Sequence, residues 1–202
     1  SIVSFMRKDA AGNFVVVEPG DERRAYLSAT YGVPCIADVA ELQGADVVLL
    51  AVKPQVMMDV LKSMEPLAFV ADALCISIAA GLSTAKLEAA LPVGTHLVRV
   101  MPNIALLVGA GATTLCAGAW ATDDDAQTVR DLFGCIGQAF IVDEDMMDAT
   151  GAINGCGPAY VAALIEALAD AGDAQGLDRA LAEGLATQTV LGTATLMVER
   201  GQ

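Results

Sequence analysis

The chain has 202 residues, of which 55% are hydrophobic and 4% aromatic, and its formal net charge is −14. This acidic excess disfavours nucleic acid as a partner, because the field of the protein would repel a polyanion. No run of about 18 uninterrupted apolar residues is present, as a membrane span would require, and no secretory signal is recognised. The sequence therefore predicts a cytoplasmic protein with no membrane partner.

The cysteines and the single histidine limit the metal chemistry. The five cysteines form no CxxC pair, and most lie in apolar runs where reduced core thiols are common. Because only His96 could add an imidazole, we expect no metal site built from Cys and His.

Up to residue 142, short β-branched runs alternate with segments of helical period, which is typical of βαβ units around a parallel sheet. Strands are expected at residues 14–17, 47–52, 74–78, 96–100, 112–116 and 139–142. The segment 47–52 has no polar alternation, as expected of a strand covered on both faces, and we place it in the middle of the sheet.

Helix starts are indicated by local chemistry. Pro54 stands where a helix would begin, Ser83 precedes an apolar stripe, and Thr122 precedes three acids of a first turn. After about Asp143 no further strand is expected, and Asp178 can cap the second of two helices. Residues 1–142 and 143–202 are thus predicted as an α/β domain and a helical domain. Since two helices bury little, the second domain should pack on a partner or on further chain.

Candidate binding residues follow the predicted strands, where open α/β sheets bind their ligands. Lys53 could meet a phosphate or a ribose hydroxyl, or could be a solvated loop residue. The small residues of segment 77–81 would let a flat ring approach the backbone, and Pro102 with Asn103 gives a rigid turn with an amide. Ordinary strand-to-helix turns use the same residues, so each motif alone also has a structural interpretation.

Glu18 is placed like the acid that accepts from a ribose hydroxyl in a dinucleotide fold. Arg23 and Arg24 could instead attract a 2′-phosphate, which leaves the choice between NAD and NADP open. The expected Gly-rich phosphate loop is missing, because neither 109–111 nor 155–158 has the full pattern or context.

Five motifs in a fixed order closely resemble pyrroline-5-carboxylate reductase: AVKPQ at 51–55, SIAAG at 77–81, RVMPN at 99–103, GCGPAY at 155–160 and EALADAG at 166–172. The resemblance runs from about Glu18 to Glu199. It implies a Rossmann-type dinucleotide-binding domain followed by an all-helical domain that forms homodimers, often within larger homo-oligomers. It also implies the last step of proline biosynthesis, in which NADPH or NADH reduces L-1-pyrroline-5-carboxylate to L-proline.

The resemblance assigns roles position by position. The residues that match the family's cofactor-binding positions are Glu18, Ala51, Val52, Lys53, Pro54, Ile78, Ala79, Ala80, Met101, Pro102 and Asn103. Glu144 matches an acid close to the substrate pocket, and no residue is identified as catalytic.

Several positions depart from the family pattern. Ile104-Ala105 replaces a usual Thr-Pro, Val39 stands where an Asn commonly reaches the ribose, and Asn154 and Cys156 replace small Ser residues. The family's first strand with its Gly-rich loop would precede the first residue given, and its carboxylate-binding segment would follow the last. We therefore expect the sequence to be part of a longer chain.

Two alternatives remain at the level of the sequence. The first is a related imine reductase; a β-hydroxyacid reductase is disfavoured, because its helical domain would need a catalytic Lys and none occurs after Lys86. The second is a non-catalytic, truncated dimerisation module, which the missing segments would favour.

Overall fold

The computed structural model describes residues 14–42 and 44–201, and these form two compact units that divide between Gly155 and Cys156. This division falls later than the predicted boundary at 142/143. The reason is that η4 (Glu144–Met146) and α6 (Met147–Asn154) belong with the strands, since α6 packs against β6 and β5. Each unit is described by itself below.

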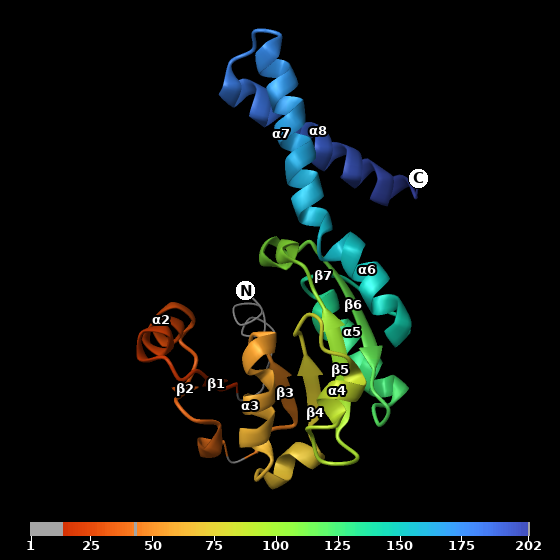
Figure 1. Ribbon diagram of the computed structural model, residues 1–202. Coiled ribbons are helices and arrows are strands. Elements are labelled where there is room, and N and C mark those ends of the chain that lie inside the picture. Colours follow the sequence, from red (N-terminus) through yellow and green to blue (C-terminus); the bar gives the residue numbers. More distant parts are fainter. Residues whose placement is uncertain (1–13, 43, 202) are drawn as a thin grey trace. The chain divides into compact units, whose positions relative to one another are not determined.

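The first unit contains two sheets (Figure 1). A small parallel pair consists of β1 (Val16–Val17) and β2 (Cys35–Ile36), with α2 (Asp21–Tyr31) between them in sequence. The main sheet has the order β3 (Val47–Leu50), β4 (Leu74–Ser77), β5 (His96–Met101), β6 (Gly111–Ala117) and β7 (Gly137–Ile141). The predicted strands are confirmed as elements, with shifts at their ends, whereas β2 was not expected from the sequence.

Two predictions about this sheet are wrong. The strand predicted for its middle, β3, lies at one end of the five-stranded order, and its Val47 is 44% exposed, whereas β4 is buried throughout. The sheet is also mixed, because β6 runs antiparallel to β5. Only the turn η3 (Ile104–Val108) separates these two strands, and so short a connection does not allow the crossover that parallel strands need.

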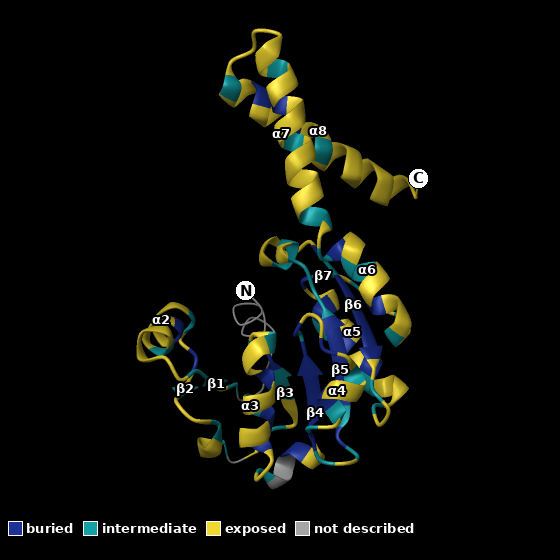
Figure 2. Ribbon diagram, in the orientation of Figure 1, coloured by how far each residue is buried: buried dark blue, intermediate teal, exposed yellow. Residues whose placement is uncertain are grey.

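Helices cover both faces of the main sheet and form two cores. On one face α3 (Pro54–Met64) and α4 (Thr84–Glu88) pack on residues such as Cys75 and Leu97, while on the other α5 (Asp123–Gly134) packs on Ile76 and Val98. Figure 2 shows the buried strands lying between more exposed helices. The predicted helix starts are confirmed: Pro54 is the first residue of α3, the Ser83 hydroxyl accepts from the Lys86 N–H, and Thr122 forms a capping box with Asp125.

Two remaining turns are short 3₁₀ helices, η1 (Val39–Glu41) and η2 (Ala68–Ala71). At the start of the β6–β7 pair, Gly111 and Gly137 lie opposite each other. Gly137 has a φ of 151°, and a Cβ added there would lie 2.0 Å from the Gly111 carbonyl oxygen. Only glycine allows the two strands to come together at this point.

The second unit is a pair of long helices, α7 (Gly157–Ala174) and α8 (Arg179–Arg200). The Asp178 carboxylate caps α8 by accepting from the Ala180 and Leu181 N–H groups, as predicted. The helices meet through Ala169, Ala182 and Ala186, with Ile165 partly buried against them. Most of their larger apolar side chains are exposed, so this unit has little core of its own (Figure 2).

One helical stretch, Glu144–Ala174, is long and apolar enough to cross a membrane by length and composition alone. The stretch contains no uninterrupted apolar run of the length sought in the sequence, because acids such as Glu166, Asp170 and Asp173 lie within it. Helices that pack against other protein surfaces have the same composition, so a single such stretch is weak evidence for a membrane span.

Candidate active site

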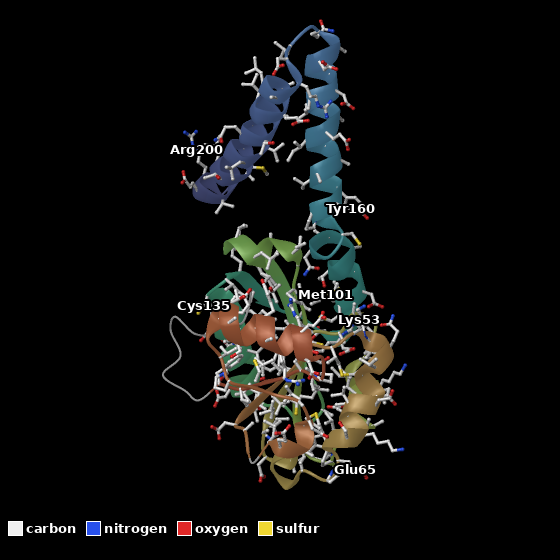
Figure 3. The ribbon with its side chains drawn as sticks, turned by 90° about the vertical axis from the view of Figure 1, so that its left-hand side faces the viewer. Lys53, Glu65, Met101, Cys135, Tyr160 and Arg200 are labelled. Atoms are coloured by element: carbon white, nitrogen blue, oxygen red, sulfur yellow. The ribbon has the colours of Figure 1, made fainter. Side chains whose placement is uncertain are left out.

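The ends of three parallel strands meet at one edge of the main sheet. Leu50 of β3 pairs with Ser77 of β4, and Ser77 pairs with Arg99 of β5, so the chain leaves all three strands at a similar level. Lys53, Ala80 and Asn103 follow within a few residues, at what we call the strand-tip edge. Figure 3 shows Lys53 and Met101 at this end, while Glu65, at the far end of α3, lies at the opposite one. The register of β3, β4 and β5 thus brings the ends of the three strands to a common edge of the sheet.

The first loop of this edge runs from Ala51 to Pro54. Ala51 and Lys53 are exposed, whereas Val52 and Pro54 are half-buried. Lys53 is the N-cap residue of α3, and its own side chain makes no capping hydrogen bond. The start of α3 therefore brings helix N–H groups and a lysine ammonium group to the same region, a combination suited to an anion.

The second loop follows β4. Ile78 is half-buried, Ala79 is buried and Ala80 is exposed. Gly81 has a φ of 73° and an added Cβ would meet nothing within 4 Å. This loop is small-sided and open, which leaves the backbone accessible to a flat group.

The third loop is held by two asparagines. The Asn103 side chain donates from Nδ2 to the Asn154 carbonyl at 3.0 Å and accepts at Oδ1 from the Ala112 N–H at 3.2 Å. Asn154 Nδ2 in turn donates to the carbonyls of Met101 at 2.7 Å and Ala112 at 3.2 Å. The half-buried Met101-Pro102-Asn103 turn is thereby fixed to the end of α6, and the Asn103 amide serves this contact. From the sequence, Asn154 stands out only as a replacement of a usual Ser, and its pairing with Asn103 could not be predicted because the two residues are 51 positions apart.

Asn154 also carries an unusual feature. It is 8% exposed, and its Oδ1 is a buried polar atom that has no hydrogen-bond partner among the described residues. Both hydrogens of its amide nitrogen have carbonyl acceptors, so the opposite amide orientation would set the oxygen against those carbonyls. The position is therefore built for donation to the strand ends.

Glu144 lies in a dense polar cluster next to the strand-tip edge. Its Oε1 accepts from Arg99 Nη1 at 2.6 Å and from the Thr84 N–H at 3.2 Å, and its Oε2 accepts from the Cys116 thiol at 3.0 Å. Burial alone raises the pKa of this carboxyl group, but the hydrogen bonds from Cys116, Arg99 and Thr84 together outweigh it and leave the pKa below its ordinary value. The group stays ionised at neutral pH.

The buried thiols are unreactive. Burial, with a smaller contribution from the neighbouring Glu144 carboxylate, raises the pKa of Cys116 to about 12, and burial raises that of Cys75 to about 11. A thiol that stays protonated is neither a nucleophile nor a metal ligand. Among the residues that the structure describes, no group of three or more His, Cys, Asp or Glu side chains could hold a metal ion.

Glu18 follows β1, which belongs to the small two-stranded sheet and is not paired with the strands that carry these three loops. Its Oε1 accepts from the Gly20 N–H at 2.9 Å. Arg24 donates to the carbonyls of Glu18 and Pro19 and pairs with Asp21, while the Arg23 guanidinium lies over the Tyr26 ring at 5.0 Å. Both arginines that could attract a phosphate therefore have local partners.

A cavity of about 420 Å³ opens elsewhere in the first unit, between the ends of β6 and β7 and the start of α5. It shares Cys116 and Glu144 with the polar cluster but includes none of the strand-tip residues 51–54, 78–80 and 101–103.

Comparison with known proteins identifies the family. Residues 144–202 match the family model described as pyrroline-5-carboxylate reductase dimerisation, and residues 2–81 match the one described as NADP oxidoreductase coenzyme F420-dependent. The chain is 43% identical over 191 residues to pyrroline-5-carboxylate reductase of Synechocystis sp., covering 94% of this chain and 70% of that protein. It is 40% identical over 192 residues to the Mycobacterium leprae enzyme, covering 93% and 65%.

Solved structures agree. A pyrroline-5-carboxylate reductase from Coxiella burnetii superposes with a TM-score of 0.91 at 32% identity, covering all of this chain and 76% of that one. The Plasmodium falciparum enzyme with NADP bound gives a TM-score of 0.83 at 30% identity, covering all of this chain and 75% of that one. The chain spans about two thirds of the length of the curated relatives it matches, 65% and 70% for the two named above. On these likenesses, which run through both the α/β unit and the helical unit, the chain belongs to the pyrroline-5-carboxylate reductase family.

Proposed function

We propose that the protein reduces L-1-pyrroline-5-carboxylate to L-proline, with NADPH or NADH as the hydride donor. The observation that carries the proposal is the common edge formed by the tips of β3, β4 and β5, in a chain of this family. Relatives bearing the reductase name support the reaction, and the relative solved with NADP supports the cofactor class.

The strand-tip edge fits a dinucleotide in its donors and in its shape. The N–H groups at the start of α3 and the exposed Lys53 suit phosphate or ribose oxygens, with Ala51, Val52 and Pro54 beside them. The small residues Ala79 and Ala80, after Ile78, leave room for the flat nicotinamide ring at the backbone.

The third loop supplies rigidity. We propose that Met101, Pro102 and Asn103 border the nicotinamide through a turn that Asn154 holds in place. The cofactor would supply the hydride, and these residues orient the two reactants, which is the main contribution of protein to such a reaction. Glu18 is proposed to face the ribose, where its carboxylate disfavours a 2′-phosphate.

The helical unit is proposed to form the homodimer, which can assemble further into the larger homo-oligomers of the family. Its match to the dimerisation model and its exposed leucines support this: Leu164, Leu181, Leu185 and Leu191 are 52%, 53%, 53% and 58% exposed. Large apolar patches of this kind mark interfaces in soluble proteins. We propose that the protein acts in the cytoplasm in this associated form.

Turnover tests the proposal directly. The purified protein is mixed with L-1-pyrroline-5-carboxylate and either NADPH or NADH, and cofactor oxidation is followed together with L-proline formation. We expect stoichiometric oxidation and proline; no turnover with either cofactor would reject the reductase function. Nicotinamide fluorescence without substrate separates a non-catalytic module, which would bind no cofactor, from an enzyme given the wrong imine.

A related imine is the second candidate. It is favoured by Asn154 and Ile104, which change the usual residues next to the Met101-Pro102-Asn103 turn. A cyclic imino acid of larger ring size, assayed in parallel, decides between the two by the ratio of kcat/KM values.

A further inference from the structure

The cluster around Glu144 joins parts of the molecule that are distant in sequence. Thr84 opens α4, Arg99 lies in β5, Cys116 lies in β6, and Glu144 opens η4. We call Arg99, Cys116, Glu144 and the Thr84 N–H the Glu144 cluster. Three elements thus send a hydrogen-bond donor to one carboxylate.

Two of these donors belong to segments that lead into or out of the strand-tip edge. Thr84 begins the helix that follows the loop 78–81, and Arg99 stands two positions before Met101. Both donate to the same oxygen, Oε1. The carboxylate therefore links the loop after β4 to the turn after β5.

Arg99 depends on this carboxylate. The residue is only 7% exposed, and a buried guanidinium group needs a counter-charge. Its other acidic contact, with Asp148 at 3.5 Å, is longer, and the Asp148 side chain is 94% exposed. Glu144, at 2.6 Å, is the close partner.

The Glu144 carboxylate is less suited to direct contact with the substrate than to holding these two segments. Both of its oxygens already accept from protein donors, and its cation partner Arg99 is buried. A substrate carboxylate would also be repelled by it, because like charges in close contact disfavour each other.

We propose that Glu144 is a positioning residue, whose carboxylate holds the 78–81 loop and the Met101-Pro102-Asn103 turn at the separation that the nicotinamide requires. This rests on the proposed function. The resemblance matches Glu144 to an acid close to the substrate pocket, and the proposal gives that acid an action exerted through Arg99 and Thr84.

The first test uses E144Q in the full protein, with D145N as the matched control because Asp145 is the exposed acid next to it in η4. We expect E144Q to lower kcat by about 10- to 100-fold, the scale of small misplacements of reactants, and to raise the KM for NADPH. The KM for the imine should change little, and D145N should behave as the wild type. A rise in the imine KM alone would overturn the proposal, since it would indicate direct contact with substrate.

A second variant separates positioning from folding. R99M/E144L replaces this ion pair, in which the Arg99 side chain is 9% and the Glu144 side chain 35% exposed, by apolar groups of similar size. Such a replacement of a buried pair often preserves or raises stability. We expect the Tm of the double variant to equal or exceed that of the wild type. Its kcat should stay lowered, and its KM for NADPH should stay raised. Recovery of wild-type kinetics in this double variant would overturn the proposal, because the pair would then serve the fold alone.

A third measurement does not depend on turnover. Amide hydrogen exchange of the 78–81 loop should be faster in R99M/E144L than in the wild type, at equal global stability. Unchanged protection would overturn the proposal even if the protein proved inactive. If the proposed reductase function were wrong, the wild type would show no turnover, while the difference in hydrogen exchange between the wild type and R99M/E144L would remain.

Discussion

The main sheet and the helical pair differ in how far their apolar side chains are buried. In the sheet, Cys75, Leu97, Val98 and Val100 are all 0% exposed. In α7 and α8, by contrast, the buried core residues are three alanines, and the leucines stay about half exposed (Figure 2). The first unit thus closes a core within its own chain. The second can bury comparable area only against another surface, so its stability should depend on protein concentration.

The largest effect is expected from truncating a core side chain in the first unit. Phe133 of α5 is 2% exposed and lies in the core formed with β4, β5 and β6. F133A should lower the free energy of unfolding by about 3–5 kcal/mol, because transfer and cavity costs add. Urea unfolding at two protein concentrations checks this, and a loss that varied with concentration would break the comparison.

The second expected effect is confined to association. L185K puts a charge on the exposed apolar face of α8, where each buried Leu contributes about 1.5–3 kcal/mol. Counting both subunits, the dimer Kd should rise by about 100-fold or more. Sedimentation velocity measures this, with L185M as the volume-conserving control that should remain dimeric. An L185K protein that is as dimeric as the wild type would place the interface elsewhere.

The smallest expected effect concerns pH and the start of α5. Burial raises the pKa of Asp125, but hydrogen bonds from Thr122 and His96 outweigh it and leave the pKa below 3.8, its ordinary value. The stabilisation is therefore present above the unfolded-state pKa and is lost as the pH falls through the lower folded-state value. D125N should cost about 1 kcal/mol near pH 7, as expected for a damaged helix cap.

Unfolding curves of the wild type and D125N over a pH series check this prediction. The difference between them should shrink below pH 3.8 and should not depend on protein concentration. A difference that grew towards acid would contradict the sign of the pKa shift.

Local chemistry explains which parts of the fold could be predicted. The capping residues Ser83, Thr122 and Asp178 act on N–H groups two or three residues away, so sequence alone identifies the helices they begin. The strand-tip edge was also predictable, because parallel strands connected by helices bring their ends to one side.

Long-range pairing explains what could not be predicted. An all-apolar segment such as that of β3 is compatible with a strand in the middle of the sheet and with one at the end of the strand order. Only the pairing with other strands decides between these two positions. The direction of β6 depends on a turn that its own residues do not reveal. Likewise, Arg99 and Glu144 are 45 positions apart, and only the packing of η4 and α6 brings them together.

The tight contact between Gly137 and Gly111 reaches further than the two strands it joins. Since β7 starts at Gly137 and the chain enters Glu144 shortly after β7 ends, the register of that strand fixes where the carboxylate stands. A methyl group at position 137 would meet the Gly111 backbone and force the two strands apart where β7 begins. A residue without a side chain thus sets the pairing of the strand that leads to Glu144.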